Sequence, residues 1–128
     1  MDKVRVAIAG LGRTGTPLLE YLLTRPWAEI VGVADGNENG RGMKVAREHN
    51  IFCTPDADVL AAKGREIDVI IEVTGDPAVK PMLRDAFIAQ GNRETVICHD
   101  VIARMLLSIV NDTDELVETF HPGDKGIG

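Results

Sequence analysis

The sequence predicts an α/β fold formed by a single domain, a doubly wound parallel sheet with helices on both faces. Segments with the apolar pattern of strands alternate with segments of helical pattern along the chain. A glycine-rich turn directly follows the first apolar segment. The length of 128 residues suits one domain that buries a core without disulfide or metal support. Because successive parallel strands are joined by right-handed crossovers through helices, this alternation places helices on both faces of the sheet.

Five apolar segments are expected to form the strands. The segment 67–73 is the richest in β-branched residues and is therefore the best candidate for a central strand of the sheet. The other four strands are expected over residues 4–9, 29–34, 51–53 and 95–98. Helices are expected over about residues 13–24, 43–48, 56–62, 77–90 and 100–110.

The fourth helix and the end of the domain rest on particular residues. Asp76 is expected to cap this helix with Pro77 in its first position, although Pro81 makes the first turn irregular or moves the helix start later. Residues 1–111 are expected to form the domain, and residues 112–128 a C-terminal tail or linker.

The glycine-rich turn after residues 4–9 has the spacing Gly-x-Gly-x-x-Gly. Gly10 lets the chain turn sharply off the strand, Gly12 lets the backbone approach a pyrophosphate, and Gly15 lets the next helix pack close to the sheet. That helix would present its free N–H groups and the positive end of its dipole to the phosphates. A strand followed by this turn and a helix indicates a dinucleotide-binding unit.

Asp35 follows the second strand segment, 23 residues beyond Gly12, where about 20 are typical of dinucleotide-binding folds. A carboxylate at this strand end accepts both hydroxyl hydrogens of an adenosine ribose and repels a 2′-phosphate, which favours NAD over NADP. The alternative is that Asp35 only starts the turn at residues 36–37. Arg41, in the loop that follows, could neutralise a 2′-phosphate, so NADP stays the less favoured cofactor.

Composition and charge exclude several other classes of function. The net charge of −6 and the lack of a clustered basic face argue against nucleic-acid partners. No apolar stretch approaches the roughly 18 residues of a membrane-spanning helix, and no signal peptide precedes the first strand, so a cytoplasmic location is expected. Cys53 and Cys98 lack the spacing of a metal or redox site, so no metal site is expected and both thiols should be reduced.

Three stretches resemble a known family: residues 6–15 (Val-Ala-Ile-Ala-Gly-Leu-Gly-Arg-Thr-Gly), 33–35 (Val-Ala-Asp) and 67–75 (Ile-Asp-Val-Ile-Ile-Glu-Val-Thr-Gly). The chain, from about residue 3 to residue 110, resembles the NAD(P)-binding Rossmann domain of homoserine and aspartate dehydrogenases and of glucose–fructose and inositol dehydrogenase-like oxidoreductases. The resemblance implies a cofactor site in which Leu11, Gly12, Arg13 and Thr14 line the pyrophosphate, Asp35 holds the adenosine ribose, and Thr74 and Gly75 lie beside the nicotinamide half.

The chain departs from that family where catalysis takes place. Members carry their substrate pocket largely in, or at the junction with, a second domain, and this sequence ends before one could begin. Sugar-type members have Glu-Lys-Pro after the fifth strand, whereas this chain has Cys98, His99 and Asp100. Three neighbours on an extended chain cannot form a catalytic relay. His99 alone is a candidate catalytic residue; the favoured alternative is that Cys98 fills the core and Asp100 caps the fifth helix.

Two further features concern Glu72 and the helix over residues 100–110. Glu72 lies within an apolar strand and must find a partner, for which the N–H groups of the glycine-rich turn are favoured over acid–base chemistry. Residues 101–110 of this helix are apolar except at Arg104 and Ser108. The helix is therefore expected to contact a second subunit or a missing domain, unless the tail folds back over it. Within the tail, residues 115–120 would form a sixth strand or a short helix.

These observations predict a stand-alone NAD(H)-binding module that acts as a nucleotide-responsive or regulatory subunit, in the form of a dimer. The alternative is an NAD-dependent dehydrogenase of an amino acid or similar small substrate, with His99 as the acid–base residue and a pocket completed by a partner chain. A minor third possibility is a module for another nucleotide such as coenzyme A, because the turn recognises pyrophosphate rather than nicotinamide.

Overall fold

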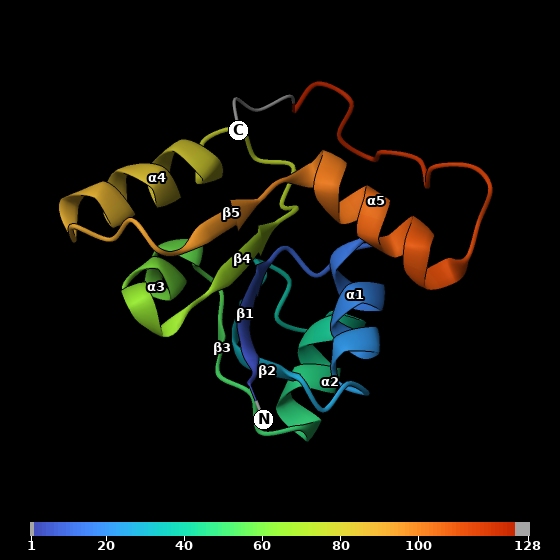
Figure 1. Ribbon diagram of the computed structural model, residues 1–128, viewed down its shortest axis with the longest axis horizontal. Coiled ribbons are helices and arrows are strands. Elements are labelled where there is room, and N and C mark those ends of the chain that lie inside the picture. Colours follow the sequence, from blue (N-terminus) through green and yellow to red (C-terminus); the bar gives the residue numbers. More distant parts are fainter. Residues whose placement is uncertain (1, 125–128) are drawn as a thin grey trace.

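A computed structural model describes residues 2–124. Five parallel strands form one sheet in the order β3-β2-β1-β4-β5, the order of a doubly wound fold, which confirms the predicted fold class (Figure 1). β1 occupies the central position, with β2 on one side and β4 on the other. The strand bounds are β1 (Val4–Ala9), β2 (Ala28–Ala34), β3 (Cys53–Thr54), β4 (Val69–Glu72) and β5 (Val96–Cys98).

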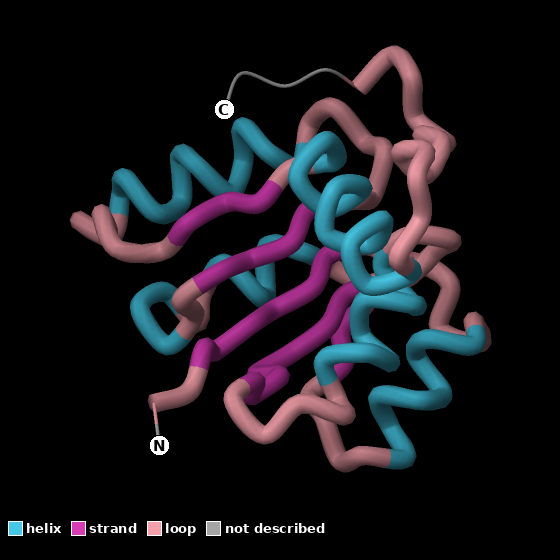
Figure 2. The backbone as a smooth tube through the Cα atoms, turned by 45° about the vertical axis from the view of Figure 1, so that its right-hand side comes forward, coloured by secondary structure: helices cyan, strands magenta, loops and turns pink. Residues whose placement is uncertain are grey.

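Helices cover both faces of the sheet, as Figures 1 and 2 show. On one face, α1 (Gly15–Leu22), α2 (Arg41–Glu48) and α5 (Asp100–Asn111) share one apolar cluster with the larger side chains of β1, such as Val6 and Ile8. On the other face, α3 (Ala57–Ala61) and α4 (Val79–Ala89) pack on Ala7 and Ala9, with a 3-10 turn at Gly64–Glu66. The alternation of β1 side chains between the two faces therefore produces two separate apolar cores.

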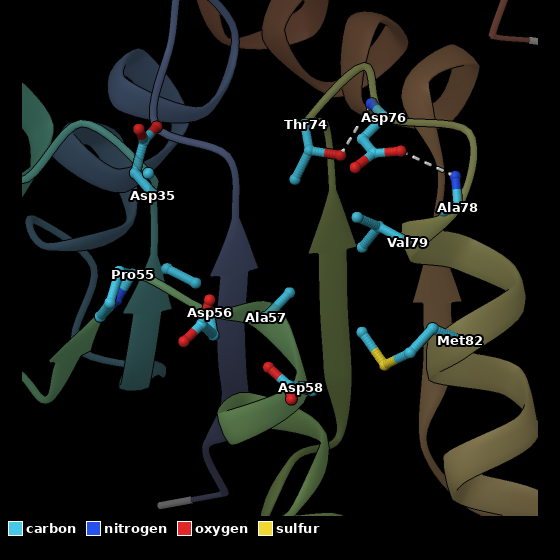
Figure 3. Close-up of a pocket in the computed structure, with 12 residues that line it drawn as sticks. Asp35, Pro55, Asp56, Ala57, Asp58, Thr74, Asp76, Ala78, Val79 and Met82 are labelled. Atoms are coloured by element: carbon cyan, nitrogen blue, oxygen red, sulfur yellow. Dashed lines mark hydrogen bonds between the residues drawn. The ribbon is translucent and has the colours of Figure 1, made fainter.

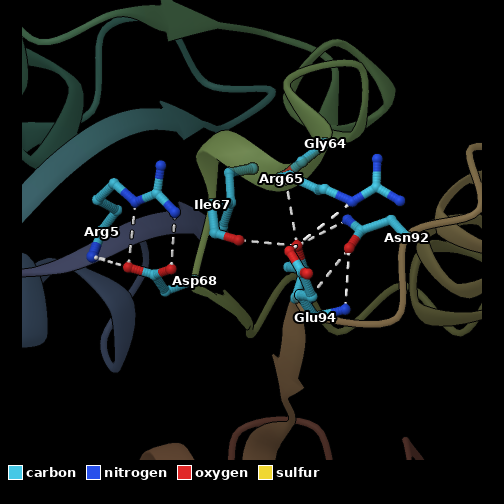
Figure 4. Close-up of polar contacts among 8 residues, drawn as sticks. Arg5, Gly64, Arg65, Ile67, Asp68, Asn92 and Glu94 are labelled. Carbon is cyan, nitrogen blue, oxygen red and sulfur yellow. Dashed lines mark hydrogen bonds and ion pairs between the residues drawn. The ribbon is translucent and has the colours of Figure 1, made fainter.

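Polar contacts connect the amino-terminal ends of β1, β4 and β5 (Figure 4). The carboxylate of Asp68 accepts hydrogen bonds from the backbone N of Arg5 at 2.8 Å and from its Nε at 3.2 Å, and its Oδ1 lies 2.9 Å from Nη2. The hydrogen bonds from Arg5 lower the pKa of the Asp68 carboxyl. Thr95 Oγ1 donates to the Ile67 carbonyl at 2.7 Å and so ties the start of β5 to β4.

The start of α4 differs from the expected capping. Asp76 Oδ1 accepts a hydrogen bond from the N–H of Ala78 at 2.9 Å, so it closes a turn, and the helix begins at Val79 instead of at Pro77. This later start was one of the two outcomes expected from Pro81. Pro81 is the third residue of the helix, where the backbone N–H has no intrahelical partner to lose.

The tail after α5 contains neither a strand nor a helix up to residue 124, so the prediction for residues 115–120 is wrong. It folds back along α5 toward the carboxyl edge of the sheet (Figures 1 and 2). Arg104 Nε donates to the Val117 carbonyl at 2.9 Å, and the Val117 N–H donates to Ser108 Oγ at 2.9 Å. The tail lies on the polar stripe of α5 because its backbone finds partners there.

Most of the apolar surface of α5 stays exposed beside this tail. Five of its apolar side chains are exposed, with exposed fractions that range from 37% at Leu106 to 68% at Ile109; the other three are Val101, Ile102 and Met105. A groove of about 320 Å³ between α1, α5 and the sheet continues this surface and is lined by apolar side chains that include Leu18, Tyr21 and Trp27. The folded-back tail therefore leaves the apolar face of the helix open.

Candidate functional site

The glycine-rich turn joins β1 to α1 at the carboxyl edge of the sheet. Gly10 has a φ of +99°, and a Cβ there would lie 2.7 Å from the backbone of Val73 and Thr74. A Cβ on Gly15 would collide with the carbonyl oxygen of Gly10. A Cβ on Gly12, by contrast, would meet nothing within 4 Å. The fold thus requires Gly10 and Gly15, whereas Gly12 exposes the backbone to open space.

Asp35 connects this turn to the end of β2. Its Oδ2 accepts a hydrogen bond from the Leu11 N–H at 2.6 Å, and its Oδ1 accepts one from the Asn37 N–H at 2.8 Å. The second bond is the turn-starting role weighed from the sequence, and the first is an additional tie to the glycine turn. Both bonds fix the carboxylate at the rim of a pocket.

The pocket has a volume of about 450 Å³ and lies between the ends of β2 and β4 (Figure 3). Four carboxylates line it, those of Asp35, Asp56, Asp58 and Asp76, together with apolar side chains that include Val79 and Met82. None of its described lining residues is basic. Arg41 instead forms an exposed ion pair with Glu20 at 2.6 Å on the side of α1.

Glu72 is fully buried at the end of β4. Its Oε2 accepts hydrogen bonds from the backbone N of Thr74 at 2.8 Å and from Thr74 Oγ1 at 2.7 Å. The expectation that Glu72 bonds the glycine-rich turn is wrong, because the chain turns immediately after Val73 and brings the polar groups of Thr74 to the carboxylate. Thr74 Oγ1 in turn accepts a hydrogen bond from the Asp76 N–H at 3.1 Å. Hydrogen bonds therefore connect Glu72 through Thr74 to Asp76 and fix the turn after β4.

His99 precedes α5 and is 9% exposed. Its Nδ1 lies 3.3 Å from Glu72 Oε1, and its Nε2 lies 3.3 Å from the carbonyl oxygen of Asp124.

Cys98 lies in the core, where burial raises the pKa of its thiol to about 11, so it is not a thiolate nucleophile. The expected cap is wrong: Asp100 is the first residue of the helix, and its Oδ2 accepts from Thr119 Oγ1 at 3.0 Å.

The end of the tail covers the part of the site that holds Thr74 and Gly75. The His121 ring occupies the position that a Cβ on Gly75 would need. The guanidinium carbon of Arg13, in the glycine turn, lies 4.6 Å from the centre of the Phe120 ring. No pattern in the sequence indicated that the tail would bring His121 to this edge.

The residues predicted from the sequence come together at one edge of the sheet, formed by the carboxyl ends of β1, β2, β4 and β5. This is where doubly wound folds bind ligands, at the point where the strand order reverses. Sequence reasoning missed six side chains at this edge because they lie in turns, in the first turn of α3 or in the tail, and match no spacing pattern: Asp56, Asp58, Asp76, Phe120, His121 and Asp124.

Comparison with known proteins gives fold neighbours only. No protein-family model matches the chain, and no curated protein matches it. Among solved structures, GenD2 from gentamicin A biosynthesis in complex with NAD is 16% identical, with a TM-score of 0.51 over 89% of this chain and 40% of that one. Scyllo-inositol dehydrogenase from Lactobacillus casei with bound NAD(H) and scyllo-inositol is 14% identical, with a TM-score of 0.56 over 88% of this chain and 35% of that one. Homoserine dehydrogenase from S. aureus is 14% identical, with a TM-score of 0.52 over 80% of this chain and 33% of that one.

These similarities confirm the predicted resemblance at the level of the fold: the chain has a Rossmann-like fold shared with GenD2 and scyllo-inositol dehydrogenase, both solved with NAD(H) bound. The chain spans between a third and two fifths of the length of these three neighbours. No helix within residues 2–124 combines the length and the apolar character that a membrane crossing requires.

Proposed function

We propose that this chain binds NAD(H) at the carboxyl edge of its sheet and acts as a nucleotide-responsive or regulatory module. The observation that carries the proposal is the exposed backbone at Gly12, directly beside the carboxylate of Asp35. A pyrophosphate would lie over residues 11–14, at the N-terminus of α1, where the positive end of the helix dipole favours an anion. The adenosine ribose would then reach Asp35.

The charge of the adjoining pocket favours NAD over NADP. A 2′-phosphate would enter a pocket with four carboxylates and no basic side chain among its described lining residues. Arg41, which could have neutralised that phosphate, is paired with Glu20. Electrostatic repulsion therefore supports the choice of NAD.

The nicotinamide half would extend toward Thr74 and Gly75, and there it meets the His121 ring. Binding of the whole dinucleotide would require residues 119–124 to move away from this edge. The tail has no regular secondary structure and is held mainly by single hydrogen bonds, so its displacement needs no unfolding of the sheet or helices. A segment that moves when the nucleotide binds is what a regulatory module needs.

The alternative proposal is an NAD-dependent oxidoreductase with His99 as its acid–base residue, completed by a partner chain or oligomer. The observation that favours it is the contact of His99 with the buried carboxylate of Glu72, which would fix the orientation of the ring. In either case we propose that the exposed apolar face of α5 forms a homodimer contact or seats a partner domain.

Calorimetric titration with NAD, NADH, NADP and coenzyme A tests the proposal. We expect micromolar binding of NAD or NADH and weaker binding of NADP. Gly12→Val should abolish binding without lowering the melting temperature, because its side chain projects into open space. Equal binding by the variant, or binding of none of the four nucleotides, would contradict the proposal. Turnover of a small substrate that disappears in His99→Ala would favour the enzyme instead.

A further inference from the structure

Three side chains from separate parts of the chain meet beside the nucleotide site. Glu72 comes from the end of β4, His99 from the residue before α5, and Asp124 from the tail. Each offers one ligand atom, and these atoms lie within 4.8 Å of one another. Glu72 is fully buried and His99 nearly so.

Two atoms of this cluster have no hydrogen-bond partner among the described residues, although both are buried: Glu72 Oε1 and His99 Nδ1. They lie 3.3 Å apart without forming a hydrogen bond. The other carboxylate oxygen, Oε2, is already bonded twice by Thr74. A buried carboxylate oxygen without a partner is costly, so a group that satisfies it is missing.

The other ring nitrogen indicates which kind of group fits. Nε2 lies 3.3 Å from the backbone carbonyl of Asp124, which can only accept a hydrogen bond, so Nε2 carries a proton. In the neutral ring, Nδ1 then presents a lone pair to Glu72 Oε1. Two lone pairs 3.3 Å apart attract a cation between them. With bonds of about 2.0–2.1 Å, an ion that touches both atoms subtends an angle of roughly 105°, close to tetrahedral.

We propose that Glu72, His99 and Asp124 bind a divalent transition-metal ion of the Zn²⁺ class. Imidazole nitrogen with two carboxylates suits Zn²⁺, Mn²⁺ or Fe²⁺, whereas Mg²⁺ and Ca²⁺ prefer oxygen alone. The N–H of Nε2 donated to a carbonyl is the usual outer contact of a metal-binding histidine. Asp124 Oδ1 lies 3.6 Å from Nε2, so this carboxylate must turn toward Nδ1 and Glu72 to reach the ion, and its place in the irregular tail allows such a turn.

Three protein ligands leave a coordination position open. The cluster borders a cavity of about 430 Å³ whose lining includes His99, Arg104, His121 and Asp124. Water or an oxygen of a small ligand would complete the coordination from this side. This proposal stands on the cluster alone and does not depend on NAD binding.

Calorimetric titration of the EDTA-treated, untagged chain with ZnCl₂ and with MnCl₂ tests the site. We expect one equivalent of Zn²⁺ to bind, and Asp124→Asn and His99→Gln to weaken binding at least tenfold. Asp124→Asn changes only a tail side chain, so it keeps the test valid if Glu72→Gln fails to fold. His49→Gln is the matched control, because His49 is an exposed histidine outside the cluster.

The Co²⁺ absorption spectrum gives a second readout. A tetrahedral site produces strong visible bands that should disappear in His99→Gln and persist in His49→Gln. Absence of stoichiometric binding by the unmodified chain would overturn the proposal, as would equal affinities of the His99 and Asp124 variants and the unmodified chain. An NMR spectrum in which Nδ1 and Nε2 of His99 both carry protons, unchanged by added Zn²⁺, would also overturn it, because a proton would then fill the gap.

Discussion

Asp35→Asn is the sharpest test of the ribose assignment. The asparagine amide has nearly the same shape, and its oxygen can keep the bond to the Leu11 N–H, while water can reach the exposed Asn37 N–H. The carboxylate charge that would hold the ribose hydroxyls is lost. A hydrogen bond to a charged group is worth about 1.5–3 kcal/mol, which corresponds to about 10- to 150-fold in Kd. We expect the affinity for NAD to fall by this factor.

Asp76→Asn is the matched control for this change. It removes the same charge from the same pocket, and its amide oxygen can keep the bond to the Ala78 N–H. Calorimetry on both variants therefore separates a direct ribose contact from the general effect of a less negative pocket. Asp35→Asn should also bind NADP relatively better. Equal NAD affinities of Asp35→Asn and Asp76→Asn would refute the assignment of Asp35 to the ribose.

Three further predictions concern the tail, the apolar helix and the amino-terminal ends of the strands. His121→Ala should raise the affinity for NADH several-fold in calorimetry by clearing the space beside Gly75, and an unchanged or lower affinity would show that the ring does not obstruct the site. Leu106→Glu should convert a dimer to a monomer in sedimentation; a chain that is monomeric without the change would contradict the proposed contact. Arg5 lowers the pKa of Asp68 in the folded chain below the ordinary carboxyl pKa of 3.8. The pair therefore stabilises the fold at pH values above 3.8, and this stabilisation is lost as the pH falls through the lower pKa of the folded state. Urea unfolding of Asp68→Asn should therefore show less loss of stability below about pH 4, and an unchanged pH profile would contradict this role.

The sequence predicted the sheet and its glycine turn well because local rules determine both. The β-branched run of β4 and the alternation of β1 each specify a strand whose neighbours follow from right-handed crossovers. Gly10 and Gly15 are required by close backbone approach, which no other residue permits. Helix starts were less predictable: α4 begins at Val79 and not at Pro77, because the side chain of Asp76 accepts a hydrogen bond from the Ala78 N–H and closes a turn before the helix.

The polar interior of the site could not be predicted in the same way. Glu72 was recognised as a buried carboxylate in need of a partner, yet Thr74 lies only two residues away and satisfies one oxygen locally. The other oxygen lies 3.3 Å from Nδ1 of His99, which comes from a different strand end. Asp124 arrives through a tail whose path depends on scattered contacts with α5. Such long-range contacts leave no periodic pattern in a single sequence.

The tail connects the proposed metal site and the proposed dinucleotide site physically. Asp124 would hold it on the metal, and His121, three residues earlier, lies where the nicotinamide half of a dinucleotide would bind. A metal that fixes Asp124 therefore makes His121 harder to displace, and a dinucleotide that displaces His121 pulls a ligand away from the metal. By thermodynamic linkage, each must weaken the binding of the other by the same factor. Asp124→Asn removes the bond between the metal ion and the tail but leaves His121 in place. The affinity of that variant for NADH should therefore no longer change when Zn²⁺ is added.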